Sequence, residues 1–145
     1  MDISKQQYEK MYKQASKGTK WYVTTPKAFF FGGLICLLGQ SLLDLYRSLG
    51  LEQKTASLAV SVTLIFLSAF FTALGWYEKL AKHAGAGTLV PITGFANSVA
   101  APALEFKTEG WILGLGAKIF IISGPVILYG TLASIAYGLI YYLLT

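Results

Sequence analysis

Charged residues are scarce in this chain. Of its 145 residues, 13% are Asp, Glu, Lys or Arg and 54% are hydrophobic. A soluble domain usually has about a quarter of its residues charged, and a chain of one-domain length needs that polar surface because so much of it faces water. The composition therefore excludes a soluble domain and predicts an all-α, polytopic integral membrane protein whose apolar surface is covered by the lipid bilayer.

Histidine and cysteine are almost absent, with His83 and Cys36 as the only examples. A single cysteine excludes an intramolecular disulfide. One imidazole, one thiol and scattered carboxylates provide neither a metal site nor a nucleophile with its base. The run GAG at 85–87 lacks the strand and the Lys-Ser pair of a nucleotide loop, and no basic face alternates with stacking aromatics. We therefore expect no enzyme activity, no cofactor and no nucleic-acid partner.

Basic charge gathers in the N-terminal segment, residues 1–25. An excess of lysine beside a membrane span predicts a cytoplasmic location, close to anionic headgroups. Residues 3–14 predict a short amphipathic surface helix. The long n-region is unlike a cleavable signal peptide, so we expect the first apolar run to stay as a membrane anchor. The basic residues before that run are Lys5, Lys10, Lys13, Lys17, Lys20 and Lys27, against Asp2 and Glu9.

Three long apolar stretches lie within the transmembrane domain, residues 26–145. Each is long enough to cross the roughly 30 Å hydrocarbon layer, which predicts three full transmembrane helices at about 28–49, 55–77 and 125–144. Pro26 suits the first turn of the first helix. Aromatic residues mark the predicted ends of the spans, where their amphipathic rings prefer to lie: Trp21, Tyr22, Trp76, Tyr77, Tyr141 and Tyr142.

The stretch at about 85–122 is apolar but rich in residues that interrupt helices. Non-helical backbone at membrane depth is tolerated only where protein covers it or water lines it, so we expect a broken or re-entrant helical segment. Ser123-Gly124-Pro125 predicts a break between a short helix at 110–122 and the last span. Whether 88–104 crosses the bilayer or turns back stays open. The expected interruptions are Gly85, Gly87, Pro91, Gly94, Asn97 and Pro102.

Polar groups inside this apolar segment are the best candidates for function. Helix ends at membrane depth expose backbone donors with partial positive charge, which suits an anionic solute. The equally weighted alternative is that these groups only cap and satisfy the broken helices. A lysine at this depth would offset the negative charge of such a solute. The candidates for a pathway or gate are Thr88, Pro91, Thr93, Gly94, Asn97, Ser98 and Lys118.

A second set of residues predicts helix packing or contact with a partner. Small residues in the first span let a neighbouring helix approach closely. Gln40 and Asp44, four residues apart, share one helical face, which we expect to meet protein or water rather than lipid. Glu105 also lies near membrane depth, where an isolated charge needs a partner. The set consists of Gly32, Gly33, Gly39, Gln40, Asp44 and Glu105.

The central run GAGTLVPITGFANS at 85–98 resembles the signature of the SpoVA family of sporulation membrane proteins. The resemblance continues downstream in ALEFKTEG at 103–110, GLG at 114–116 and Gly124-Pro125. Upstream it includes Ala28-Phe29, GGLIC at 32–36 and Gly39-Gln40. It covers roughly residues 8–144, and its central run is specific rather than compositional.

The resemblance implies a protein of the inner (forespore or spore) membrane of a spore-forming bacterium. It implies passage of dipicolinic acid, with its calcium, during sporulation and germination, and one family member is associated with tension-gated channel activity. Implied partners are an AE-type membrane subunit and a soluble, dipicolinate-binding AD-type subunit. A chain of three or four crossings has no room for an aqueous pore, so conduction would need a homo- or hetero-oligomer. The alternative is a non-conducting scaffold that assembles other sporulation proteins.

Overall fold

The first two long helices form an antiparallel pair. The computed structural model describes residues 5–15 and 20–144, and the short N-terminal helix predicted at 3–14 is present as α1 (Lys5–Ala15) within that range. Helix α2 (Trp21–Ser48) is followed by α3 (Gln53–Ala73). A buried stripe of α3, spaced every four residues as a helix face requires, comprises Ala56, Val60, Leu64 and Ser68.

Helix α2 begins seven residues before the predicted start of the first span. Pro26 therefore lies inside the helix, not in its first turn as predicted. The proline removes one hydrogen bond to the carbonyl four residues earlier. In the first turn of α2, Thr24 Oγ1 lies 3.4 Å from the carbonyl oxygens of Lys20 and Trp21. Near the other end of the pair, the hydroxyls of Tyr46 and Thr63 join α2 to α3 at 2.8 Å.

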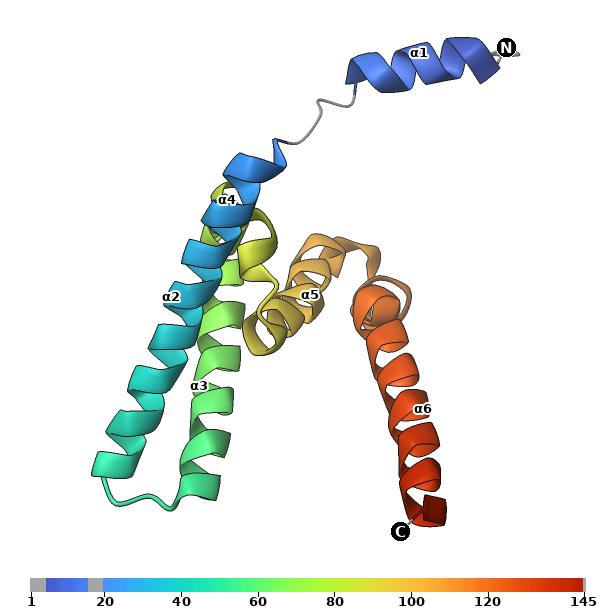
Figure 1. Cartoon of the computed structure of the whole chain (residues 1–145). Coiled ribbons are helices and arrows are strands. Elements are labelled where there is room, and N and C mark those ends of the chain that lie inside the picture. Colours follow the sequence, from blue (N-terminus) through green and yellow to red (C-terminus); the bar gives the residue numbers. More distant parts are fainter. Residues whose placement is uncertain (1–4, 16–19, 145) are drawn as a thin grey trace.

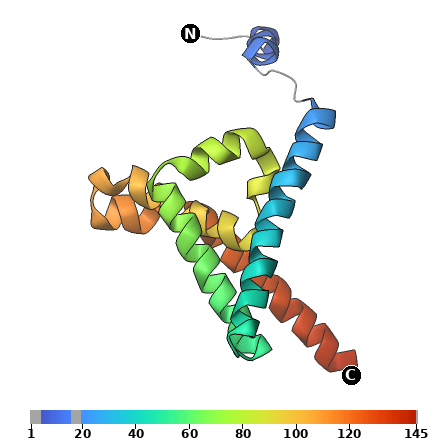
Figure 2. The ribbon, with the colours of Figure 1, turned by 90° about the vertical axis from the view of Figure 1, so that its left-hand side faces the viewer.

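The second long helix ends earlier than predicted. Gly75 has a φ of +70°, in the left-handed region that favours glycine, so α3 ends at Ala73 rather than near residue 77. Helix α4 (Trp76–Ala84) then changes direction, and Figure 2 shows it lying across the end of α3 toward α2. The 3₁₀ turn η1 (Gly85–Thr88) follows beside α2.

The predicted repeated breaks at 91–102 are wrong. Helix α5 (Pro91–Glu105) runs continuously through Gly94, Asn97 and Pro102. Pro91 occupies the first turn, where a missing N–H costs nothing, and Pro102 lies near the other end, where it interrupts only the last turn. The interruption is concentrated before the helix, at 85–90.

The predicted break at Ser123-Gly124-Pro125 is also wrong. The 3₁₀ turn η2 (Lys107–Glu109) and the π-helix η3 (Trp111–Gly116) lead into α6 (Phe120–Leu144), which passes through all three residues. The irregularity is the π-helix, a rare form that occurs mostly as a single turn within a longer helix. Together η3 and α6 form one apolar helix, Trp111–Leu144. The third long helix therefore starts at residue 111 rather than at the predicted residue 125.

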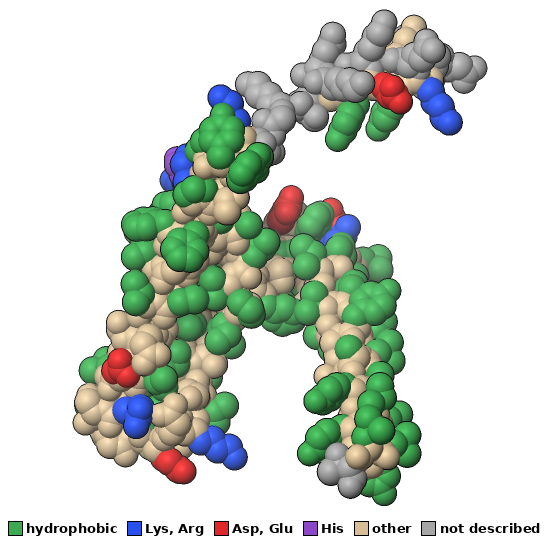
Figure 3. Space-filling model, in the orientation of Figure 1, with side chains coloured by type: hydrophobic (Ala, Val, Ile, Leu, Met, Phe, Trp, Pro, Cys, Tyr) green, Lys and Arg blue, Asp and Glu red, His purple; other side chains and the backbone are tan. Residues whose placement is uncertain are grey.

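In the described residues, 5–15 and 20–144, three helices are long and apolar enough to cross a membrane: Trp21–Ser48, Gln53–Ala73 and Trp111–Leu144. This confirms the predicted all-α polytopic architecture. Figure 1 shows α6 standing apart from the α2–α3 pair, with α5 between them. Large hydrophobic side chains cover the outside (Figure 3). An exposed surface of this kind fits lipid as its surroundings.

Candidate functional site: the re-entrant segment

The segment 85–109 enters and leaves at the same end of the molecule. Figures 1 and 2 show η1 beside the N-terminal half of α2, and α5 climbing from its deep N-terminal end back toward the end where α4 lies. The C-terminus of α6 lies at the opposite end, at about the same level as the α2–α3 loop but on the other side of the molecule (Figure 1). The segment therefore turns back rather than crossing.

Close backbone contact between η1 and α2 fixes the entry of this segment. A Cβ at Gly87 would meet the carbonyl oxygen of Ala28 at 2.5 Å, closer than real Cβ contacts occur. A Cβ at Gly32 would meet the Gly87 carbonyl oxygen at 3.4 Å. Two glycines, one on each side, thus let the chain lie directly on the α2 backbone.

Three hydrogen bonds join α3 and α4 to the segment. The Tyr77 hydroxyl donates to the Thr88 carbonyl at 2.8 Å. The Ser68 hydroxyl donates to the Thr93 carbonyl at 2.6 Å. The Thr72 hydroxyl lies 2.8 Å from the side-chain oxygen of Asn97 and 2.7 Å from its own helix carbonyl. We call the three pairs, Tyr77–Thr88, Ser68–Thr93 and Thr72–Asn97, the polar seam. The seam lies within an otherwise apolar bundle.

A polar pocket of 570 Å³ opens beside the last pair of the seam, between the α3–α4 turn and α5. Asn97 and Glu105 reach it from α5 and Glu78 from α4. The Lys82 ammonium lies 2.7 Å from the Glu78 carboxylate, and its hydrogen bond, with its charge, lowers the pKa of Glu78. The pocket lining is Thr72, Gly75, Tyr77, Glu78, Ala81, Asn97, Ala101, Leu104 and Glu105.

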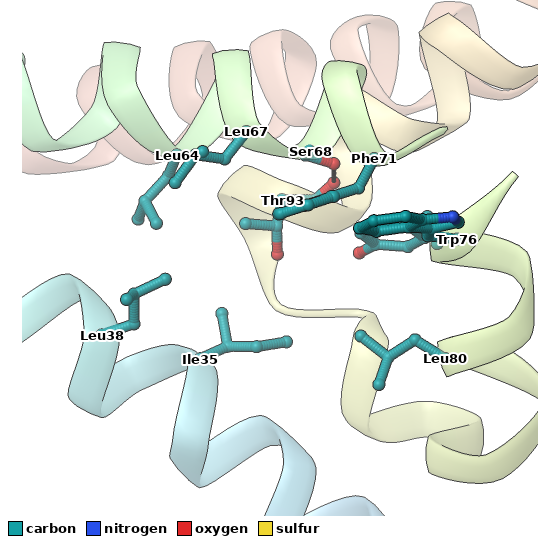
Figure 4. A pocket seen from close by; sticks show the side chains of 10 residues that line it. Ile35, Leu38, Leu64, Leu67, Ser68, Phe71, Trp76, Leu80 and Thr93 are labelled. Carbon is teal, nitrogen blue, oxygen red and sulfur yellow. Dashed lines mark hydrogen bonds between the residues drawn. The ribbon is translucent and has the colours of Figure 1, made fainter. Parts of the chain in front are cut away.

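Two further hollows are apolar. One, of 310 Å³, lies between α2, α3, α4 and the start of α5 (Figure 4). The other, of 580 Å³, is a groove between α3 and α5 in which Pro91 and Phe95 take part. The three spaces differ in chemistry, and only the polar pocket offers charged and amide groups to a solute.

The predicted pathway residues are only partly brought together. Thr88, Thr93 and Gly94 lie near one another, since a Cβ at Gly94 would meet the Thr88 carbonyl at 3.0 Å. The Thr88 hydroxyl donates to the Gly85 carbonyl at 3.0 Å and that of Thr93 to the Val90 carbonyl at 3.4 Å. Their hydroxyls thus bond to the segment's own backbone, as the capping alternative expects.

The other pathway candidates lie on different sides of α5. Asn97 lines the polar pocket, whereas Pro91 lines the apolar groove. The Ser98 hydroxyl bonds to the Phe95 carbonyl of its own helix at 2.8 Å. The Lys118 ammonium lies 4.5 Å above the Phe106 ring, a cation–π contact, and is not part of the pocket lining. Among the predicted pathway residues, Asn97 alone lines the polar pocket.

Among the predicted packing residues, two glycines of α2 meet other elements. Gly32 faces η1, and a Cβ at Gly39 would lie 3.6 Å from Leu64 of α3. A Cβ at Gly33 would have nothing within 4 Å in the described part of the chain. On the exposed side of α2, the Gln40 amide donates to the Asp44 carboxylate at 3.0 Å.

Sequence reasoning missed the partners in the seam: Ser68, Thr72 and Tyr77. Ser68 and Thr72 are hydroxyl residues four apart in a charge-free span, a spacing that places them on one helical face. That spacing was the available signal. Within the described ranges 5–15 and 20–144, no group of three or more His, Cys, Asp or Glu side chains could hold a metal ion.

Three long apolar helices and a re-entrant helix define a polytopic helical membrane protein. Residues 24–140 match the family model of the SpoVAC/SpoVAEB sporulation membrane proteins, and the chain belongs to that family. It is 45% identical over 115 residues to stage V sporulation protein AC of Bacillus subtilis (strain 168), covering 79% of this chain and 77% of that protein. The extended basic N-terminus predicts the same AC type. No solved structure matches the chain.

Proposed function

We propose that the chain is a membrane channel subunit that passes dipicolinic acid, with calcium, across the inner membrane of the spore. The observation that supports this most is Asn97, which lines a polar pocket along the C-terminal half of a re-entrant helix. Re-entrant helices at membrane depth typically line water-filled cavities or are buried in protein. The similarity to a stage V sporulation protein supports the setting.

Charge in the pocket favours a neutral form of the cargo. Glu105 lines the pocket and has no ion pair among the described residues, so a bare dicarboxylate dianion would meet like charge there, whereas Lys82 balances the charge of Glu78. In a one-to-one calcium chelate the metal's two charges cancel those of the two carboxylates. The chelate would enter without this repulsion, and its carboxylate oxygens, which keep partial negative charge, would still be attracted to Lys118 beyond the pocket.

The pathway would be completed by further subunits and opened by membrane tension or rearrangement of partners. The pocket lies within one chain, and α6 packs mainly against α5, which leaves its outer faces to lipid or to other subunits. The proposed further subunits are the AE-type membrane subunit and the AD-type soluble subunit. If the N-terminus is cytoplasmic, three crossings and a re-entrant segment would put the C-terminus on the other side of the membrane.

Efflux from liposomes tests the proposal. Purified chain is reconstituted with trapped calcium dipicolinate, alone and with the AE-type subunit, and efflux is followed after osmotic downshock. Asn97→Leu should slow efflux roughly tenfold, the effect of about 1.4 kcal/mol on a barrier. Ser98→Ala, which alters the next residue outside the pocket, should leave efflux unchanged. No efflux with either composition, from folded and inserted protein, would contradict the proposal.

A non-conducting scaffold is the second candidate. The observation that favours it is that the Thr88 and Thr93 hydroxyls bond inside the segment and so do not donate to a solute. In that case Asn97→Leu would leave efflux intact in a complete complex and change only how much partner co-purifies. Measuring both quantities on the same preparation separates the two functions.

A further inference from the structure

The apolar cavity between α2, α3 and α4 has no use in the proposed pathway. Its volume is 310 Å³, about ten groups of methylene or water size at roughly 30 Å³ each. Side chains of α2, α3 and α4, together with Thr93 of α5, line the cavity (Figure 4). The lining is Ile35, Leu38, Leu64, Leu67, Ser68, Phe71, Trp76, Tyr77, Leu80 and Thr93.

The three hydroxyl groups in this lining, those of Ser68, Tyr77 and Thr93, are already bonded to backbone carbonyls. The Ser68 hydroxyl donates to the Thr93 carbonyl, and the Tyr77 hydroxyl donates to the Thr88 carbonyl. The Thr93 hydroxyl reaches the Val90 carbonyl at 3.4 Å. A water needs two to four polar partners to occupy a cavity, so water fits this one poorly. The occupant that the chemistry selects is hydrocarbon.

Helix α4 forms one wall of the cavity, and its residues suit the level of lipid headgroups. Trp76 and Tyr77 are the amphipathic aromatics that prefer the membrane–water interface. Lys79 is one helical turn from Trp76 and next to Leu80 of the lining. Lys82 is paired with Glu78, whereas Lys79 is exposed and has no ion pair among the residues that the structure describes.

We propose that this cavity holds part of one acyl chain of an anionic phospholipid, about ten carbons by its volume, while the headgroup phosphate lies against the ammonium of Lys79. The chain would pack against the Ser68–Thr93 hydrogen bond, which joins α3 to the re-entrant helix. Loss of the acyl chain would leave a void beside this bond. The position of α5 would thereby depend on whether lipid occupies the cavity. The bilayer would in this way influence the position of the re-entrant segment directly.

Lipid binding by the detergent-solubilised full chain tests this without any transport, so its outcome is independent of the proposed channel. Native mass spectrometry counts bound dioleoyl-phosphatidylglycerol during a titration. We expect one saturable site, with dioleoyl-phosphatidylcholine bound about fivefold more weakly, as one lysine near anionic lipid implies. Lys79→Gln should remove this preference. Equal affinity of the wild-type chain for both lipids would overturn the headgroup assignment.

Filling the cavity should abolish the site. Leu38→Phe should weaken phosphatidylglycerol binding at least tenfold, and Ile35→Phe, from the same helix, should act alike. Leu37→Phe is the matched control, because Leu37 is 64% exposed and lies outside the lining. Equal binding by the Leu37 and Leu38 variants would overturn the proposal.

A second readout avoids any change to the cavity. In protein carrying Trp21→Phe and Trp111→Phe, Trp76 is the only indole. Phosphatidylglycerol with brominated acyl chains should quench its fluorescence with saturation at one lipid per chain in detergent. Quenching that rises without saturation would mean general contact with lipid and would overturn a discrete site.

Discussion

Adding one methyl group at Gly87 should separate the re-entrant segment from α2. In Gly87→Ala the new Cβ would lie 2.5 Å from the Ala28 carbonyl oxygen and 3.0 Å from the Ala28 Cα, whereas ordinary contacts begin near 3.4 Å. Both atoms belong to helix backbone and cannot rotate away. Overpacking of this kind costs about 1–3 kcal/mol.

Thermal unfolding in detergent, followed by circular dichroism, measures this effect. At about 2–4 °C per kcal/mol for a chain of this size, Gly87→Ala should lower the Tm by several degrees. Gly33→Ala is the matched control, since its Cβ meets nothing within 4 Å and replacing a mid-helix glycine by alanine gains up to about 1 kcal/mol. Equal melting of Gly87→Ala and wild type would refute the close approach of η1 to α2.

Three further results follow from single contacts. Lys118→Glu should reduce anion efflux more than Lys118→Gln, because reversal adds repulsion to the lost attraction; equal efflux would remove the lysine from the pathway. Ser68→Ala should lower the unfolding free energy by about 1 kcal/mol through loss of its bond to Thr93, and an unchanged Tm would contradict this. Lys82→Gln should return the pKa of Glu78 upward toward its ordinary value, as a carboxyl NMR titration would detect; an unchanged pKa would exclude the ion pair.

The three long helices could be predicted because lipid imposes a simple rule on composition. A span must be apolar for its whole length, and the described chain has three helices of that kind. Their ends were less predictable. Gly75 ends α3 through a left-handed turn, and the adjacent aromatic pair begins a new helix, whereas hydropathy alone joins the two.

Local rules about proline failed where tertiary contacts decide. Pro91 and Pro125 were treated alike as breaks, yet Pro91 starts α5 and Pro125 lies inside α6. Proline at a first helical position is a recognised start signal, so the first of these could have been predicted. Nothing in the sequence around Pro125 indicates that the irregular turn lies instead at 111–116.

The candidate site likewise has some features that the sequence predicts and others that only the fold shows. The glycines of α2 were predicted to allow close approach, and Gly32 and Gly39 do face other elements. The partner of Asn97 was not predictable, because Thr72 lies 25 residues away and only the fold brings the two side chains together. Sequence therefore indicates which residues are unusual at membrane depth, while packing decides which of them bond internally and which line a pocket.

Thiol labelling of intact vesicles tests most directly that segment 85–109 is re-entrant. In a Cys36→Ser background, single cysteines replace His83, Thr108 or Glu52 one at a time, and a membrane-impermeant maleimide is added from one side or both. We expect the cysteines at 83 and 108 to react from the same side and the cysteine at 52 to react from the opposite side. Labelling of 83 and 108 from opposite sides would mean that the segment crosses the bilayer, and would contradict the account.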